Sequence, residues 1–163
     1  MRKFFHLVIL LSVAFSASTV FAAGGLFDHP LAGKKAPDVS LETMKGDQIS
    51  LTQTIQGKKA IVFFWATWCP HCQDQLRALQ EKKSQLEREG IVLVLVDIGE
   101  DRDIVQRFLK EKKYDLNVFL DQNNYVAETY SVFGIPTLFF IGSDGVVRDV
   151  LHVFPDEYAQ ILK

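Results

Sequence analysis

Two runs of apolar residues constrain the fold of this chain more than any other feature of its sequence. Residues 60–65 read AIVFFW and residues 91–98 read IVLVLVDI, and neither run alternates between apolar and polar side chains. Strands of a parallel sheet that are covered on both faces have this pattern. Between the runs, residues 70–89 carry leucines at helical spacing, and Gly90 follows as a helix stop. The sequence therefore predicts a strand–helix–strand unit.

The segments on either side extend this unit. Residues 101–113 and 123–134 have helical patterns, and NVFLD between them indicates a short strand. From residue 135 the pattern changes to a strand, a Ser-Asp-Gly turn and a second strand, which predicts a β-hairpin. Pro155 is suited to the first turn of a last helix. We expect the α/β class, with a central mixed sheet flanked by helices.

The sequence predicts one folded domain, because 163 residues are enough for one core and no internal repeat is found. Residues 23–35 contain several glycines, a proline and two lysines, and we interpret them as a flexible lead-in. The domain then covers residues 36–163 and begins with a strand-rich extension, since Val39 and Leu41 alternate with polar residues.

The N-terminus has the pattern of a secretory signal peptide over residues 1–22. Two basic residues precede an apolar stretch at 4–15, and Val20 and Ala22 occupy the small-residue positions of a cleavage site. Cleavage after Ala23 is an alternative, and so is an uncleaved membrane anchor, although the apolar stretch is short for a full span. We expect an exported protein, periplasmic or otherwise extracytoplasmic.

Removal of the signal peptide makes the chain mildly acidic. The whole chain has 18 basic and 20 acidic side chains, and losing Arg2 and Lys3 leaves 16 against 20, a formal net charge of −4. This charge disfavours nucleic acid or an anionic membrane as a partner.

The chain has only two cysteines, Cys69 and Cys72, in the stretch TWCPHC. Thiols of an exported protein meet an oxidising compartment, where they pair. A bridge across two intervening residues closes a very small loop, so it restricts the unfolded chain little. A chemical role for the pair is therefore favoured over a structural one.

The pair lies where a buried strand is expected to end and a long helix to begin. Cys69 is the expected N-cap and Pro70 the first helical residue. Free backbone N–H groups and partial positive charge at a helix N-terminus stabilise a thiolate, which makes Cys69 the expected nucleophile. His71 is expected to tune the pair, and Cys72 to resolve the mixed disulfide that Cys69 forms.

Metal and haem chemistry fit the sequence less well. Structural zinc needs four ligands, and outside the predicted signal peptide the only histidines are His29, His71 and His152. Haem attachment needs a histidine directly after the second cysteine, where this chain has Gln73. A redox pair is the favoured interpretation, with a metal site or an inert disulfide as alternatives. We expect no metal and no cofactor beyond the disulfide itself.

The stretches VFFWATWCPHC and FGIPTLFFIGSDGVV resemble the thioredoxin superfamily, and GKKAPDVSLETMKGDQISL resembles the extension of its exported TlpA/ResA-type branch. The resemblance covers roughly residues 33–163. It implies a thioredoxin fold with a cis peptide before Pro136, packed near Cys69. It also implies that the backbone of Ile135 pairs with a bound substrate chain, and that Trp68 lies at the rim of the active site.

Two acids of the superfamily are missing from this chain. Thioredoxin has a buried Asp six residues before its first cysteine, where this chain has Phe63, and ResA-type proteins have a Glu three residues after the second, where it has Gln75. Both acids are thought to help deprotonate the resolving thiol. Asp74 is expected to face another way on the helix. Glu42 and Asp97 are further candidates, with polar strand-end residues as the simpler interpretation.

The resemblance implies an oxidoreductase that exchanges dithiols and disulfides with protein cysteines, and it leaves the direction open. The branch commonly supplies electrons, for example to apocytochrome c, and exchanges them with a membrane donor or acceptor protein. Pro70-His71 is instead the dipeptide of the oxidant DsbA, whose potential is about −120 mV against about −270 mV for thioredoxin. DsbA-type proteins also insert a helical domain, for which this chain has no room. A monomeric protein-disulfide reductase is favoured, with a disulfide-forming oxidase as the alternative.

Two other functions remain as weaker alternatives. A peroxiredoxin needs Pro and Thr at fixed positions before its cysteine, and the residues seven and three positions before the first cysteine are Val62 and Ala66. A copper chaperone of the Sco type spaces its cysteines one residue further apart and adds a distant histidine, for which His152 is the candidate.

Overall fold

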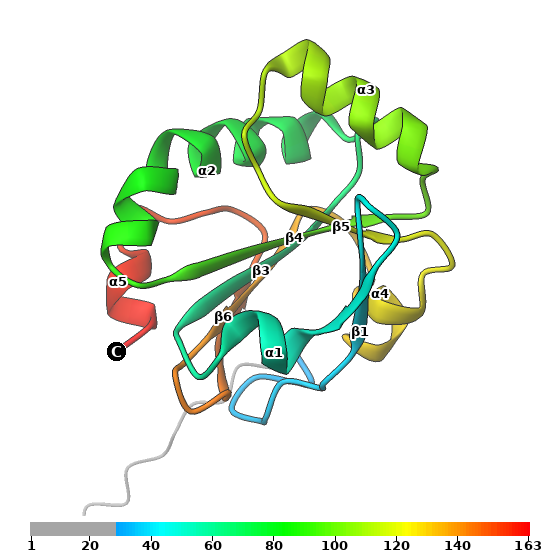
Figure 1. Cartoon of the computed structure of the whole chain (residues 1–163). Coiled ribbons are helices and arrows are strands. Elements are labelled where there is room, and N and C mark those ends of the chain that lie inside the picture. Colours follow the sequence, from blue (N-terminus) through cyan, green and yellow to red (C-terminus); the bar gives the residue numbers. More distant parts are fainter. Residues whose placement is uncertain (1–28) are drawn as a thin grey trace, which may run out of the picture.

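The computed structural model describes residues 29–163, which form a single seven-stranded sheet with the order β2-β1-β5-β4-β3-β6-β7 (Figure 1). The central strands β3, β4 and β5 are parallel, and the strands outside them pair antiparallel. This confirms the predicted mixed sheet. The strands are β1 (Ser40–Thr43), β2 (Gln48–Ser50), β3 (Ala60–Trp65), β4 (Val92–Ile98), β5 (Val118–Asp121), β6 (Thr137–Ile141) and β7 (Val147–Leu151).

Helices cover both faces of the sheet, as the sequence predicts. Helices α2, α3 and α5 pack on one face, and the short helices α1 and α4 pack on the other (Figure 1). None of these helices combines the length and the hydropathy that a membrane span requires. The helices are α1 (Leu51–Ile55), α2 (Pro70–Arg88), α3 (Arg102–Lys112), α4 (Tyr125–Thr129) and α5 (Tyr158–Ile161).

Strand β3 lies between two hydrophobic layers, one on each face of the sheet. All six of its residues are buried. Because side chains alternate along a strand, Phe63 and Trp65 enter the layer below α2, whereas Val62 and Phe64 enter the layer below α1 and α4. The unbroken apolar run thus reflects a strand covered on both faces.

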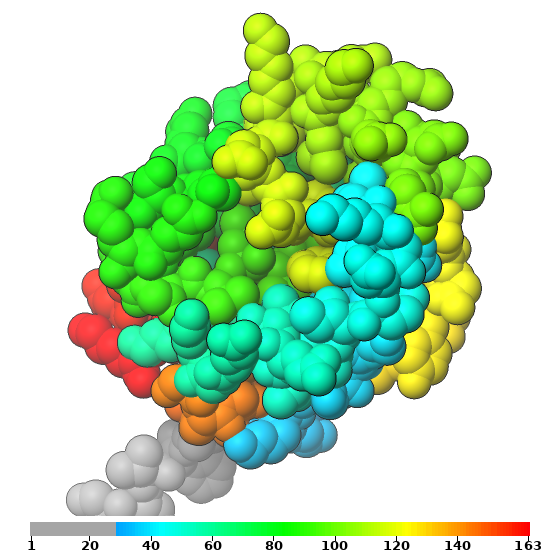
Figure 2. All heavy atoms as spheres, in the orientation of Figure 1, coloured from blue at the N-terminus to red at the C-terminus, as the bar shows by residue number. Residues whose placement is uncertain are grey.

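Part of the expected lead-in packs on the sheet. The predicted signal peptide at 1–22 lies outside the described residues, as do residues 23–28. Residues 29–35, expected to belong to a flexible lead-in, instead lie against β7 and the turn before it (Figure 2). The N–H of Gly33 donates to the Val147 carbonyl at 2.9 Å, and the N–H of Val147 donates to the Lys34 carbonyl at 2.8 Å. The described part of the expected lead-in is therefore paired with the domain and not a flexible segment.

Two helices are shorter than predicted. The expected helix over 123–134 ends at Thr129, because Ser131 adopts a left-handed conformation with a φ of 53° and turns the chain toward the loop before β6. The last helix begins after Glu157, so Pro155 lies in the preceding turn rather than in its first turn. The segment after α4 and the segment before α5 each make a long-range contact that is described below.

Candidate active site at the start of helix α2

The two cysteines lie at the junction that the sequence indicated. Cys69 is the N-cap of α2 in an extended conformation, and Pro70 is the first helical residue. The Sγ atom of Cys69 accepts a hydrogen bond from the backbone N–H of Cys72 at 3.2 Å. A helix N-terminus offers such N–H groups to negative charge, so the geometry favours a thiolate at Cys69 when the pair is reduced.

Cys69 and Cys72 form a disulfide with their Cα atoms 5.2 Å apart. Cys72 lies on the buried face of α2 and is fully buried, whereas Cys69 keeps 5% of its surface exposed. The side chain of Cys69 is therefore the more accessible of the two. This asymmetry supports the predicted roles of Cys69 as the attacking sulfur and Cys72 as the resolving one.

The loop before β6 lies directly against this disulfide. The peptide between Ile135 and Pro136 is cis, and the Ile135 carbonyl oxygen is 3.9 Å from the Sγ of Cys69. The hydroxyl of Thr137 donates to the Gly134 carbonyl at 2.6 Å and holds the loop from inside. The backbone of Ile135 is thus presented next to the sulfur that a substrate would approach.

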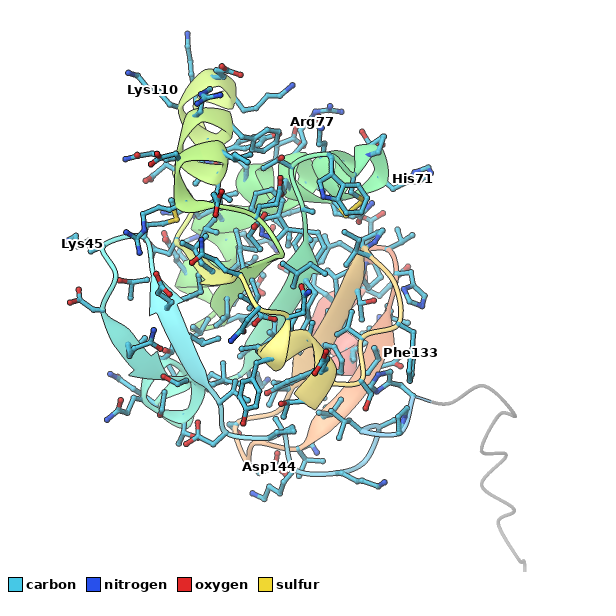
Figure 3. All side chains as sticks on the ribbon, turned by 90° about the vertical axis from the view of Figure 1, so that its right-hand side faces the viewer. Lys45, His71, Arg77, Lys110, Phe133 and Asp144 are labelled. Carbon is cyan, nitrogen blue, oxygen red and sulfur yellow. A yellow bond between two sulfur atoms is a disulfide. The ribbon has the colours of Figure 1, made fainter. Side chains whose placement is uncertain are left out.

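Exposed aromatic and polar side chains lie on the two segments that meet at the disulfide, the start of α2 and the loop before β6. Trp68 is 68% exposed next to Cys69, and Phe133 on the loop before β6 is 90% exposed. His71 is also exposed, and Figure 3 shows His71 and Phe133 pointing outward on the same side of the molecule. Trp68 and Phe133 are the two most exposed of the large apolar side chains among residues 29–163.

Asp74 and Glu42, which the sequence offered as acids that could assist Cys72, both form ion pairs. Asp74 is exposed and pairs with Arg77 at 3.4 Å. Glu42 on β1 pairs with Arg102 at the start of α3. Gln75, which replaces the expected glutamate, accepts a hydrogen bond from the backbone N–H of Phe154 at 2.7 Å. Its role in the fold is therefore to hold the segment after β7 against α2.

Asp97 is the acid whose position the sequence did not reveal. It is fully buried, and neither of its carboxyl oxygens has a hydrogen-bond partner among residues 29–163. It stands opposite Trp65 in the β3–β4 register and, two positions after Leu95, on the sheet face covered by α2 and both cysteines. Burial raises the pKa of the Asp97 carboxyl to about 9, and the nearby Glu100 carboxyl adds to the rise.

Glu100 connects this buried acid to the cysteine loop. Its carboxylate accepts hydrogen bonds from the backbone N–H of Thr67 at 2.5 Å and from the hydroxyl of Thr67 at 2.6 Å. The carbonyl of Thr67 in turn accepts a hydrogen bond from the Gln73 side chain at 2.8 Å. One signal for this arrangement was present in the sequence, because an acid inside the apolar run VLVLVDI must be buried at a cost unless it has a purpose.

A third buried acid shows what a purely structural carboxylate looks like. Asp121 at the end of β5 accepts hydrogen bonds from the backbone N–H groups of Val126 and Ala127 at 3.0 and 2.8 Å. Burial raises the pKa of Asp121, and these hydrogen bonds counteract the rise. Asp121 thus binds the first turn of α4, whereas Asp97 accepts no backbone hydrogen bond among residues 29–163. Within residues 29–163 no group of three or more His, Cys, Asp or Glu side chains is arranged to hold a metal ion.

Comparison with known proteins agrees with this geometry. The profile of the AhpC/TSA family matches residues 32–150. The thiol-disulfide oxidoreductase ResA of Bacillus cereus is 28% identical over 148 residues, covering 90% of this chain and 85% of the relative. ResA of Bacillus subtilis is 31% identical over 119 residues, covering 73% of this chain and 66% of the relative.

Solved structures show the same fold. The crystal structure of a putative thiol:disulfide interchange protein DsbE from Chlorobium tepidum superimposes with a TM-score of 0.70 at 24% identity, covering 80% of this chain and 92% of that one. At this identity the likeness concerns the fold, which is that of thioredoxin.

Proposed function

The chain belongs to the AhpC/TSA family of thioredoxin-like proteins, and we propose that it is an exported thiol–disulfide oxidoreductase that reduces disulfides of other proteins. One observation carries this proposal. The only two cysteines pair at the N-terminus of α2, with the more exposed sulfur beside the backbone of Ile135. The family and the ResA relatives support the exchange chemistry, and the direction toward reduction is our inference.

The proposed reaction begins with the reduced protein. The Cys69 thiolate attacks one sulfur of a substrate disulfide, the S–S bond breaks, and the other substrate sulfur leaves as a thiolate that takes a proton from solvent. The result is a mixed disulfide between Cys69 and the substrate. The Cys72 sulfur then attacks the Cys69 sulfur, the mixed disulfide breaks, and the second substrate sulfur leaves as a thiolate that takes a proton from solvent. The substrate gains two electrons, and the protein ends with the Cys69–Cys72 disulfide.

Resolution requires that Cys72 lose its proton inside the core. We propose that Asp97 takes it, because the Asp97 carboxyl is fully buried on the sheet face that α2 and Cys72 cover. A pKa of about 9 in the disulfide form means that Asp97 carries a proton at neutral pH at the end of the cycle. When a donor reduces the disulfide again, that proton returns to Cys72. No cofactor beyond the disulfide is needed.

The substrate is proposed to bind as an extended chain along the loop before β6. The backbone of Ile135 supplies hydrogen bonds as a short strand edge, and Pro136 and Trp68 bound the approach to Cys69. The partners are protein thiols and disulfides, for which the cysteines of apocytochrome c are one candidate, and a membrane protein that supplies the electrons. The N-terminal signal pattern supports an extracytoplasmic location.

The proposed direction of electron flow, toward reduction of substrate disulfides, is supported by the elements that lie between α2 and Pro136. Between α2 and the loop at Pro136 the chain forms only β4, α3, β5 and α4, without the helical insertion of DsbA-type oxidases. The dipeptide Pro70-His71 favours the alternative, a disulfide-forming oxidase, because it stabilises the reduced pair.

Reduction of insulin disulfides in the presence of dithiothreitol tests the proposal. The wild-type protein should accelerate the precipitation of insulin, and Cys69→Ser should abolish the acceleration. Turnover at the wild-type rate in Cys69→Ser would refute a role for the pair. Comparing the rate of insulin reduction with the rate of oxidising a reduced model protein decides between the reductase and the oxidase.

A further inference from the structure

His152 lies at the end of β7, next to the loop that faces the disulfide. Its Nδ1 atom is 2.7 Å from the carbonyl oxygen of Pro136 and 3.4 Å from the hydroxyl oxygen of Thr137. Because a carbonyl can only accept, Nδ1 must carry a proton and donate it to Pro136. The side chain therefore ties the end of β7 to the peptide that follows Pro136.

The same segment is tied to α2 from its other side. The backbone N–H of Phe154, two residues after His152, donates to the Gln75 side-chain oxygen at 2.7 Å. Gln75 lies one helical turn after Cys72 on α2. The contacts thus form a closed path from α2 through Gln75 and Phe154 to His152, then through Pro136 and Ile135 back to Cys69 at the start of α2.

His29, which also lies near this loop, has a different pattern of hydrogen bonds. The Nδ1 atom of His29 accepts from the backbone N–H of Leu31 at 3.2 Å, so its Nε2 carries the proton and donates to the Ser131 carbonyl at 3.1 Å. Both nitrogens of His29 are occupied by backbone groups that fix the first residues of the domain. Among the hydrogen bonds of residues 29–163, His152 is engaged only through Nδ1.

We propose that His152 is a positioning residue for substrate capture, which holds the Ile135–Pro136 peptide at the distance from Cys69 that a bound chain needs. This inference rests on the proposed function. Gly134 and Phe133, which precede the peptide, are exposed, so few other contacts restrain the loop on its outer side. A loop that is ordered before binding loses less conformational entropy when the substrate binds. His152 thereby acts on binding and not on the sulfur chemistry.

Three substitutions of His152 distinguish a contribution of Nδ1 from one of Nε2. In His152→Asn the amide nitrogen can stand where Nδ1 stood, whereas in His152→Gln it reaches the position of Nε2, and His152→Phe has no donor. We expect His152→Phe and His152→Gln to raise the KM for insulin about threefold to tenfold with kcat nearly unchanged, since one hydrogen bond to the loop is lost. We expect His152→Asn to stay within twofold of the wild type.

Two measurements that need no bound chain serve as controls. The alkylation rate of Cys69 by iodoacetamide and the redox potential against glutathione should match the wild type in all three variants. Unchanged KM in both His152→Phe and His152→Gln, or an equal rise in His152→Asn, would overturn the proposal. A parallel loss of alkylation rate would overturn it too, because His152 would then act on the thiolate. If the wild type itself does not reduce insulin, the proposed function fails instead.

Gln75 offers an independent test of the same path. Gln75→Leu removes the acceptor for Phe154 and should raise the KM like His152→Phe. Because both contacts hold one segment, the double variant should be less impaired than the product of the two single effects. Fully multiplicative effects on KM would mean that the contacts act separately and would contradict a shared positioning role.

Discussion

The carboxylate of Glu100 accepts two hydrogen bonds from Thr67, one from its backbone N–H and one from its hydroxyl. Glu100 follows β4 and Thr67 lies in the loop between β3 and α2, two residues before Cys69. The pair fastens the cysteine loop to the end of the neighbouring strand, directly beside the buried Asp97.

Removing the Glu100 carboxylate should loosen this attachment. Glu100→Leu leaves two donors of Thr67 without an acceptor, and we expect it to lower the free energy of unfolding by about 1–3 kcal/mol. Glu100→Gln keeps one acceptor oxygen and should lose less. Urea denaturation of the oxidised proteins measures both values, and equal stability of Glu100→Leu and the wild type would show that the contact contributes nothing.

Replacing the resolving cysteine should trap the substrate. In Cys72→Ser the Cys69 thiolate still attacks a disulfide, but no second thiol releases the product, so a mixed disulfide accumulates. Non-reducing electrophoresis of Cys72→Ser mixed with a disulfide-bonded protein should show the covalent complex. Cys69→Ser is the matched control. Complex formation by Cys69→Ser but not by Cys72→Ser would reverse the assigned roles.

The exposed His71 should set part of the redox potential. Because a histidine near the Cys69 sulfur stabilises the reduced thiolate form, His71→Gly should make the potential more negative, by about 30 mV for each 1.4 kcal/mol of stabilisation lost. We expect the wild-type value to lie between about −270 and about −120 mV. Equilibration with glutathione measures both proteins, with His71→Gln as a control for polarity without charge. A shared potential for all three would exclude His71 as the tuning group.

Asp97 should matter for the resolving step. Asp97→Asn cannot take a proton from Cys72, so resolution slows at least about tenfold and the mixed disulfide becomes visible during turnover. Asp121→Asn is a matched control, because Asp121 is also a buried acid but bonds to the backbone of α4. We expect it to lower stability without prolonging the mixed disulfide. Wild-type kinetics in Asp97→Asn would remove Asp97 from the mechanism.

Asp97 should also make the stability of the oxidised protein depend on pH. Its pKa of about 9 in the fold lies above the unfolded value of 3.8, so the folded state retains a proton that the unfolded state loses between these values. The contribution of this carboxyl to stability is therefore complete below pH 3.8 and falls as the pH rises toward 9. The free energy of unfolding of Asp97→Asn, relative to that of the wild type, should therefore rise by at least about 1.4 kcal/mol between pH 5 and pH 8. A constant difference between the two proteins would contradict the raised pKa.

Local patterns in the sequence determined much of this protein. The period of apolar residues predicted β3, α2 and β4, because a buried strand and an amphipathic helix differ in spacing within a few residues. The N-cap at Cys69 and the first helical residue Pro70 followed from the same local chemistry. The pairing of Cys69 with Cys72 needed no distant residue either.

The tertiary structure decided every feature that joins residues far apart in the chain. The Ile135 carbonyl reaches the Cys69 sulfur across 66 residues, and Gln75 holds Phe154 across 79. The burial of Asp97 depends on the packing of α2 over β4, and the early end of α4 depends on where the loop before β6 must go. Such contacts arise from the packing of several elements at once, which the spacing of residues within one element does not encode.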